Sequence, residues 1–176
     1  MARSLRPYNW VIIVGLFFCL FGGAYAVQGL SVSHAEDAKE AIVPDQAYTP
    51  LGGTTINLHQ FRGKTILVHY WASWCPPCVK EFPSLIAAAK ANPDIVVITI
   101  SVDNHRAPMD AFLERIPESR TLNNVYYVLD SAYKIPTNGV RVNDFPTTFI
   151  IKPDMTLKSR IQGGVNWMNV TFERAS

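Results

Sequence analysis

The chain has 176 residues, of which 48% are hydrophobic, and this is enough apolar material for one packed domain. Its 16 basic residues exceed its 14 acidic residues by two, an excess that Arg3 and Arg6 account for. The rest of the chain is therefore electrically neutral, which argues against a nucleic-acid-binding protein.

The first distinct segment is an uncharged stretch that covers residues 7–33. We predict a cytoplasmic N-terminus at residues 1–9 and a transmembrane anchor at residues 10–30, because about 20 apolar residues span a bilayer and the preceding arginines stay inside. The alternative is a signal peptide cleaved after Ala24-Tyr-Ala26. Both interpretations export the body of the protein to a compartment where disulfides persist.

The predicted body begins after a polar linker at residues 31–46 and covers residues 47–176. Gly52-Gly53 predicts a β-hairpin that joins strands at residues 47–51 and 54–58. Beyond it, strand and helix patterns alternate, which is typical of an α/β fold. The predicted strands are residues 66–71, 95–102, 126–129, 147–151 and 157–161. One predicted helix begins with a proline directly after Cys75 and has helical periodicity over residues 79–92, with a kink at Pro83, and a second covers residues 108–116.

The sequence Cys75-Pro-Pro-Cys78 places two thiols one helical turn apart, directly after the strand at residues 66–71. If Cys75 is the N-cap, its sulfur can accept only from the second or third helical amide, and Pro77 at the second position has no N–H. The Cys75 thiolate is then only moderately stabilised. Since strong oxidants are those whose reduced form is specially stabilised, the double proline favours a reductant.

The two sulfurs are expected to differ in role, with Cys75 exposed and attacking and Cys78 buried and resolving. Glu81 follows Cys78 by three residues on the same helical face. It either holds a proton for the dithiol or is a solvated acid that complements the helix N-terminus. His69, in the strand before the dithiol, is either a core histidine or a proton partner of Cys78.

A metal site is not expected, because structural zinc needs four ligands and Cys75 and Cys78 have no second cysteine pair. The other histidines, His34, His59 and His105, lie in polar segments. A redox-active Cys75–Cys78 disulfide needs no further cofactor.

Three motifs together resemble the thioredoxin superfamily, and within it the TlpA/ResA/CcmG-like group of membrane-tethered thiol–disulfide oxidoreductases. The resemblance covers about residues 47–164. Its motifs are Leu58-His-Gln-Phe-Arg-Gly-Lys64, the stretch from Val68 to Pro83 that contains the dithiol, and Asp144-Phe-Pro-Thr-Thr-Phe-Ile-Ile151.

This resemblance implies a thioredoxin-like fold, with a central mixed β-sheet, helices on both faces and an N-terminal hairpin. It implies a cis-proline at Pro146 beside the dithiol, with Phe145, Trp74 and Pro76 contacting substrate, and it maps a functional acid onto Glu81. His69 departs from the family pattern, which has a buried acid or an asparagine at that position.

The sequence therefore predicts a reductase of protein disulfides, anchored in the bacterial cytoplasmic membrane with its domain on the periplasmic side, or soluble there after signal cleavage. By resemblance, apocytochrome c is a client and a membrane dithiol protein of the DsbD or CcdA type is the electron donor. Two alternatives stay open. One is a disulfide-forming oxidant on the same fold, and the other is a metal-binding or copper-delivery module.

Overall fold

The computed structural model of the protein describes residues 42–135, 137, 139 and 142–172. The predicted cytoplasmic segment, the predicted anchor at residues 10–30 and most of the predicted linker lie outside these residues. Within the described ranges, no helix combines the length and the apolar character that a membrane span requires.

A five-stranded mixed sheet forms the centre of the described domain, in the order β5-β4-β3-β6-β7. β3 pairs in parallel with β4 and antiparallel with β6, β4 pairs in parallel with β5, and β6 pairs antiparallel with β7. This confirms the predicted central mixed sheet. The strands are β3 (Thr65–Trp71), β4 (Ile95–Ser101), β5 (Val125–Leu129), β6 (Thr147–Ile151) and β7 (Leu157–Gln162).

Two buried strands make up the middle of this sheet. All seven residues of β3 and all seven of β4 are buried. β4 lies between two parallel neighbours, as its continuous apolar sequence predicts, since such a run is typical of a strand covered on both faces. The dithiol therefore follows the central strand of the sheet.

The two described α-helices, α2 (Pro76–Ala91) and α3 (Arg106–Leu113), pack on one face of the sheet. Phe82 of α2 and Phe112 of α3 both contact Trp71 of β3, with ring centroids 4.3 and 5.1 Å away. The resemblance implied helices on both faces. Here the crossovers from β3 to β4 and from β4 to β5 step in the same direction, so right-handed connections place both helices on the same side.

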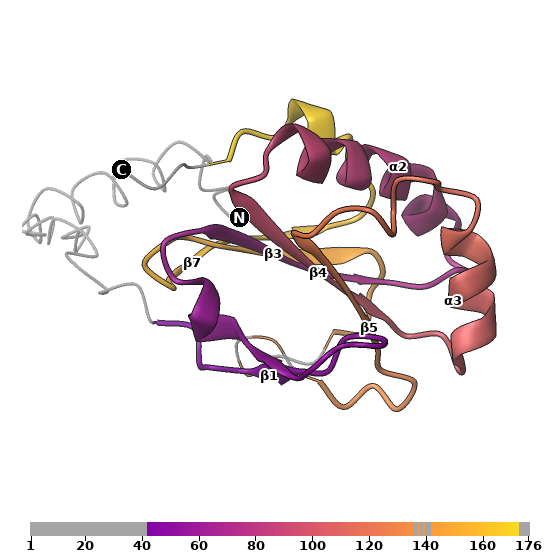
Figure 1. Ribbon diagram of the computed structural model, residues 1–176, viewed down its shortest axis with the longest axis horizontal. Coiled ribbons are helices and arrows are strands. Elements are labelled where there is room, and N and C mark those ends of the chain that lie inside the picture. The colour runs from indigo at the N-terminus through magenta and orange to yellow at the C-terminus, as the bar shows by residue number, and fades with distance from the viewer. Residues whose placement is uncertain (1–41, 136, 138, 140–141, 173–176) are drawn as a thin grey trace, which may run out of the picture. The chain divides into compact units, whose positions relative to one another are not determined.

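The opposite face carries the first described residues, 43–62, and residues 130–135 that follow β5 (Figure 1). Tyr70 of β3 points to this face, where its hydroxyl group lies 2.7 Å from Thr137 Oγ1, and Tyr48 lies 3.4 Å from the same atom. The 3₁₀ helix η1 (Leu58–Phe61) packs Phe61 against Tyr126. In Figure 1, α2 lies above the strands of the sheet and β1 (Ala47–Tyr48) lies below them.

The N-terminal strands are shorter than predicted. β1 (Ala47–Tyr48) and β2 (Ile56–Asn57) pair antiparallel over two residues each. The connecting turn is closed from Gly53 N–H to Pro50 O at 3.2 Å rather than by a two-residue loop at Gly52-Gly53. The predicted longer pairing does not form because Leu51 donates its N–H to Tyr127 of β5 instead.

Candidate active site

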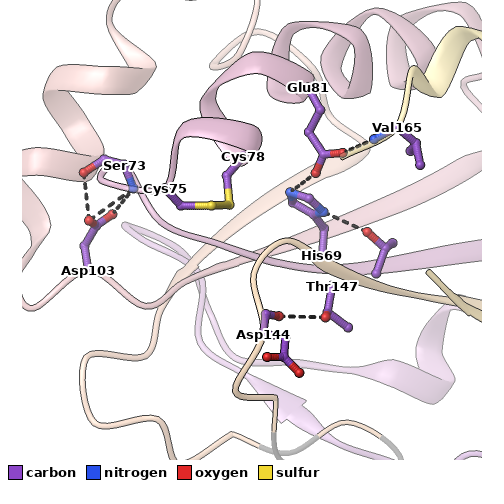
Figure 2. Close-up of a disulfide and its surroundings, with 10 residues drawn as sticks. His69, Ser73, Cys75, Cys78, Glu81, Asp103, Asp144, Thr147 and Val165 are labelled. Carbon is purple, nitrogen blue, oxygen red and sulfur yellow. Dashed lines mark hydrogen bonds and ion pairs between the residues drawn. A yellow bond between two sulfur atoms is a disulfide. The ribbon is translucent and has the colours of Figure 1, made fainter. Parts of the chain in front are cut away.

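The dithiol lies at the N-terminus of α2 as a disulfide between Cys75 and Cys78, with the two Cα atoms 5.3 Å apart (Figure 2). Cys75 is the N-cap, in extended backbone conformation, and its side chain makes no capping hydrogen bond. Pro76 and Pro77 occupy the first two helical positions. The predicted helix start is confirmed, and α2 continues without interruption through Pro83, which lies on its exposed side.

The exposure predicted for Cys75 is wrong for this disulfide state. Cys75 is only 4% exposed and Cys78 is fully buried. Cys75 lines a groove at the surface of the described domain. The relative order is as predicted, since Cys75 is the more accessible of the two.

This groove has a volume of about 610 Å³ and is walled mainly by aromatic and proline side chains. Trp74 is 58% exposed and its ring lies edge-on to Phe145, with centroids 6.1 Å apart. The structure therefore brings together three of the four residues that the resemblance assigns to substrate contact. The lining residues are Trp74, Cys75, Pro76, Pro77, Tyr133, Asn143, Asp144 and Phe145.

The fourth, Pro146, lies directly behind the groove wall. The Phe145–Pro146 peptide bond is cis, as the resemblance implies. Pro146 is buried and does not line the groove, and its carbonyl group accepts the N–H of Gly163 at 2.9 Å. Its backbone thereby joins the loop before β6 to the segment after β7.

Sequence reasoning missed Tyr133, which extends the aromatic wall. Its ring centroid lies 6.1 Å from that of Phe145, and its backbone has φ +52°, which is uncommon for a non-glycine residue. Asp130 holds this conformation, because its buried carboxylate accepts the N–H groups of Lys134 and Ile135 at 2.9 and 2.7 Å. The available signal was an aspartate directly after a hydrophobic strand, a residue that favours such turns.

Sequence reasoning also missed Asp103, a buried aspartate beyond the end of β4. Its carboxylate accepts the N–H and hydroxyl groups of Ser73 and the hydroxyl group of Ser101. Ser73 lies in the loop between β3 and α2, next to Trp74. Asp103 thus holds the dithiol loop to the neighbouring strand (Figure 2).

Glu81 is buried, with 4% exposure, so the alternative of a solvated acid is wrong. Its Oε2 accepts the Val165 N–H at 2.8 Å, and its Oε1 lies 3.6 Å from His69 Nε2. Burial raises the pKa of Glu81 to about 7, although the hydrogen bond from the Val165 N–H and the nearby Trp167 indole group act in the opposite direction. A carboxyl group with this pKa can accept and release a proton near neutral pH.

A cleft of about 500 Å³ runs beside Glu81, between α2 and the segment that follows β7. It is separated from the groove at Cys75 by Pro77, which lines both. The cleft gives the Glu81 carboxyl group a path to the surface. Its lining residues are Pro77, Lys80, Glu81, Ser84, Gly164, Val165 and Asn166.

His69 is fully buried in β3, on the face that α2 covers. Its Nδ1 lies 2.8 Å from Thr148 Oγ1 of β6, and its Nε2 points toward Glu81 (Figure 2). Burial lowers the pKa of His69 to about 3, so the ring is neutral at physiological pH. His69 is therefore a core histidine whose second nitrogen faces the acid beside the dithiol.

No cluster of three or more histidine, cysteine, aspartate or glutamate side chains suited to a metal ion occurs in the described part of the chain.

Known proteins resemble this chain in sequence and in fold. Residues 37–173 match the Redoxin family. Thiol-disulfide oxidoreductase ResA of Bacillus subtilis is 25% identical over 146 residues, which cover 82% of this chain and 75% of ResA. The soluble secreted antigen MPT53 of Mycobacterium tuberculosis is 29% identical over 109 residues, which cover 60% of this chain and 63% of the antigen.

Two solved structures from Chlorobium tepidum share the fold. A putative thiol:disulfide interchange protein DsbE superposes with a TM-score of 0.58 at 24% identity, covering 72% of this chain and 86% of that one. A thioredoxin family protein superposes with a TM-score of 0.62 at 18% identity, covering 76% and 92%. Together with the disulfide at the start of α2, these likenesses show that the chain belongs to the Redoxin family and is a thiol–disulfide oxidoreductase of the TlpA/ResA/CcmG-like group in the thioredoxin superfamily.

Proposed function

We propose that the protein works as a reductant of disulfides in exported proteins. The observation that carries this direction is the start of α2, where two prolines occupy the first two positions and Cys75 has no capping hydrogen bond. A thiolate at Cys75 has the Cys78 N–H as its one nearby helical donor. Weak stabilisation of the thiolate keeps the dithiol form ready to give up electrons.

The reaction begins with the reduced enzyme. The Cys75 thiolate attacks one sulfur of a client disulfide, the client S–S bond breaks, and the released client sulfur leaves as a thiolate that takes a proton from water. Cys78 then gives its proton to the Glu81 carboxylate and attacks Cys75 Sγ. The Cys75–Cys78 bond forms, the bond to the client breaks, and the second client sulfur leaves as a thiolate.

The enzyme ends in the disulfide form and the client has gained two electrons. A further cycle needs a dithiol donor that reduces Cys75–Cys78, and Glu81 returns its proton to Cys78. By resemblance, this donor is a membrane protein of the DsbD or CcdA type, and apocytochrome c is a client.

Client binding is assigned to the groove at Cys75, where Trp74, Phe145 and Tyr133 present aromatic surface beside the sulfur. An extended client segment with an apolar side chain next to its cysteine fits this groove, because the aromatic side chains bury a large apolar area when an apolar group packs against them. Residues 10–30 supply the proposed anchor, which holds the domain on the periplasmic side of the membrane.

A redox titration of residues 37–176 against a dithiol buffer tests the direction. A potential near or below about −270 mV supports a reductant, whereas a value near about −120 mV identifies the oxidant alternative. Copper uptake that is stoichiometric and lost in Cys75→Ser, without disulfide reductase activity, identifies the metal-delivery alternative.

Trapping tests the roles of the two cysteines. Cys78→Ser should accumulate mixed disulfides with clients through Cys75, and Cys75→Ser should not. Equal trapping by both variants contradicts the assignment. Carbonate extraction of membranes that contain the full chain, with an N-terminal sequence of the product, tests the anchor against the cleaved signal peptide.

A further inference from the structure

Three buried polar atoms without a hydrogen-bond partner converge beside the dithiol. They are Glu81 Oε1, His69 Nε2 and Trp167 Nε1, and the described residues contain one other such side-chain atom, on Trp71. An unsatisfied buried polar group is costly, and native proteins rarely leave one without a role. These three come from different elements, namely α2, β3 and the 3₁₀ helix η2 (Trp167–Asn169).

The atoms match one another as donors and acceptors. Glu81 Oε1 is an acceptor with two lone pairs, the indole Nε1 of Trp167 carries only a donor, and His69 Nε2 carries a donor in one of its two neutral tautomers. His69 Nε2 lies 3.6 Å from Glu81 Oε1, and the Trp167 indole group lies near enough to the Glu81 carboxyl group to lower its pKa. The rings of His69 and Trp167 meet edge to face, with centroids 6.3 Å apart.

The contact between His69 and Glu81 is not an ion pair. Burial lowers the pKa of His69 to about 3 and raises that of Glu81 to about 7, so both shifts favour the uncharged form. An ionised Glu81 therefore faces a neutral ring. If the ring carried its proton on Nδ1, the lone pair of Nε2 would point at the carboxylate, which is repulsive.

The contact with Thr148 is compatible with the tautomer that an ionised Glu81 requires. Its hydroxyl group can donate to His69 Nδ1, which lies 2.8 Å away, and this leaves the ring proton on Nε2. The Nε2–H then points at Glu81 Oε1, 3.6 Å away, while the Val165 N–H donates to Oε2. The carboxylate then faces neutral donors from β3, from η2 and from the segment between β7 and η2.

We propose that His69, fixed by Thr148 with its proton on Nε2, is a positioning residue that holds the Glu81 carboxylate ready to take the proton of Cys78. The expected effect of His69 on the reaction rate rests on the proposed function, whereas its expected effect on the titration midpoint of Glu81 does not. Cys78 lies one helical turn before Glu81 on α2, and Lys80 is the other charged residue that lines the adjoining cleft.

The direct test is nitrogen-15 NMR of His69 in the oxidised wild-type domain, combined with a carbon-13 titration of the Glu81 carboxyl group. We expect the Nε2–H tautomer at every pH where Glu81 is ionised. An Nδ1–H tautomer, or a doubly protonated ring, in that range overturns the proposal.

Variants test the effect on Glu81. His69→Leu keeps the site apolar and removes the donor, so the Glu81 midpoint should rise by about one pH unit, the equivalent of one hydrogen bond to a charged group. Thr148→Val should raise the Glu81 midpoint by less, because this variant removes the hydroxyl group beside His69 Nδ1 and no longer fixes the tautomer, but it keeps the imidazole ring. Thr148→Ser keeps the hydroxyl group and should leave the midpoint unchanged. A midpoint that stays constant or falls in His69→Leu overturns the proposal.

The kinetic test measures how fast Cys78 resolves a mixed disulfide on Cys75 as a function of pH. At pH 7 the His69→Leu variant should be about fivefold slower, because a smaller fraction of Glu81 is ionised, and the two enzymes should converge at higher pH. A rate that is reduced equally at every pH indicates a structural role only. An oxidant-like potential would refute the proposed function and leave the Glu81 titration untouched, so the two failures are distinguishable.

Discussion

Asp103 holds Ser73 by two groups at once, accepting its backbone N–H at 3.1 Å and its hydroxyl group at 2.8 Å. Ser73 immediately precedes Trp74 and Cys75, so a carboxylate from beyond β4 positions the loop that begins the active site. The same carboxylate also accepts the Ser101 hydroxyl group. One buried side chain therefore ties the end of β4 to the start of the site.

Removing that carboxylate should destabilise the domain. Asp103→Ala leaves several buried donors unsatisfied, and we expect a loss of about 2–4 kcal/mol in the free energy of unfolding, measured by urea denaturation. Asp94→Ala, at an exposed aspartate, is the matched control and should change stability by less than about 0.5 kcal/mol. Equal effects of the two variants would contradict the assigned role.

The helix start makes a prediction about redox potential. Pro77→Ala restores an N–H at the second helical position, where it can donate to the Cys75 thiolate, so the potential should become more positive by about 30 mV for about 1.4 kcal/mol of added stabilisation. Pro76→Ala is the control, because the first helical amide does not reach the cap side chain. A larger shift in the control than in Pro77→Ala would exclude this explanation.

The buried acid makes a prediction about stability and pH. The pKa of Glu81 rises from 4.5 to about 7 on folding, so the folded state holds this proton more tightly, and stability is lost as the pH rises through that interval. Glu81→Gln should therefore gain stability relative to wild type from about pH 4.5 to about pH 7, by about 1 kcal/mol per pH unit, and then level off. Glu114→Gln, at an exposed position, should show no such trend in denaturant titrations of the oxidised protein.

His69 contributes with the opposite sign. Its pKa falls from 6.5 to about 3 on folding, so its contribution is lost as the pH falls through that range. In the interval that the two groups share, their contributions oppose each other in the wild-type protein. The Glu81→Gln variant alone should therefore lose stability steadily on acidification from about pH 6.5, and a flat profile there would be inconsistent with a buried neutral His69.

The groove makes a prediction about client recognition. Tyr133→Ala and Trp74→Ala each remove an aromatic wall, and kcat/KM for a peptide disulfide with a neighbouring phenylalanine should fall about fivefold, for about 1 kcal/mol of lost contact. Met168→Ala is a suitable control, because Met168 is an exposed apolar residue outside the groove. An equal loss for a peptide with glycine in place of phenylalanine would show that the walls do not select apolar side chains.

Local rules were sufficient for the dithiol and its helix. Cys75 as N-cap, the prolines in the first turn and the apolar strands all follow from residues close together in the sequence. His69 and Glu81 were each singled out as well, but their contact could not be predicted, because it depends on how α2 sits over β3.

Asp103 and Asp130 were harder to foresee for a related reason. Each accepts backbone N–H groups from a loop, and the course of a loop is set by tertiary contacts rather than by its own sequence. The predicted length of the N-terminal strands was wrong for the same reason. The hydrogen bond from the Leu51 N–H to Tyr127 of β5 competes with the strand pairing that Gly52-Gly53 favours. The exposure of Cys75 was misjudged because it depends on tertiary packing, since residues of the loop before β6 line the groove beside it.

The antiparallel direction of β6 has a consequence for how such an enzyme can diversify. Because β6 is antiparallel to β3, the first residues of β6 lie at the same end of the sheet as the last residues of β3, β4 and β5. The first turn of α2 supplies the two sulfurs that exchange electrons there. The connection between β5 and β6 supplies part of the lining of the groove beside Cys75. Sequence changes in that connection would therefore change which client polypeptides bind, without changing the two cysteines that carry out the disulfide exchange.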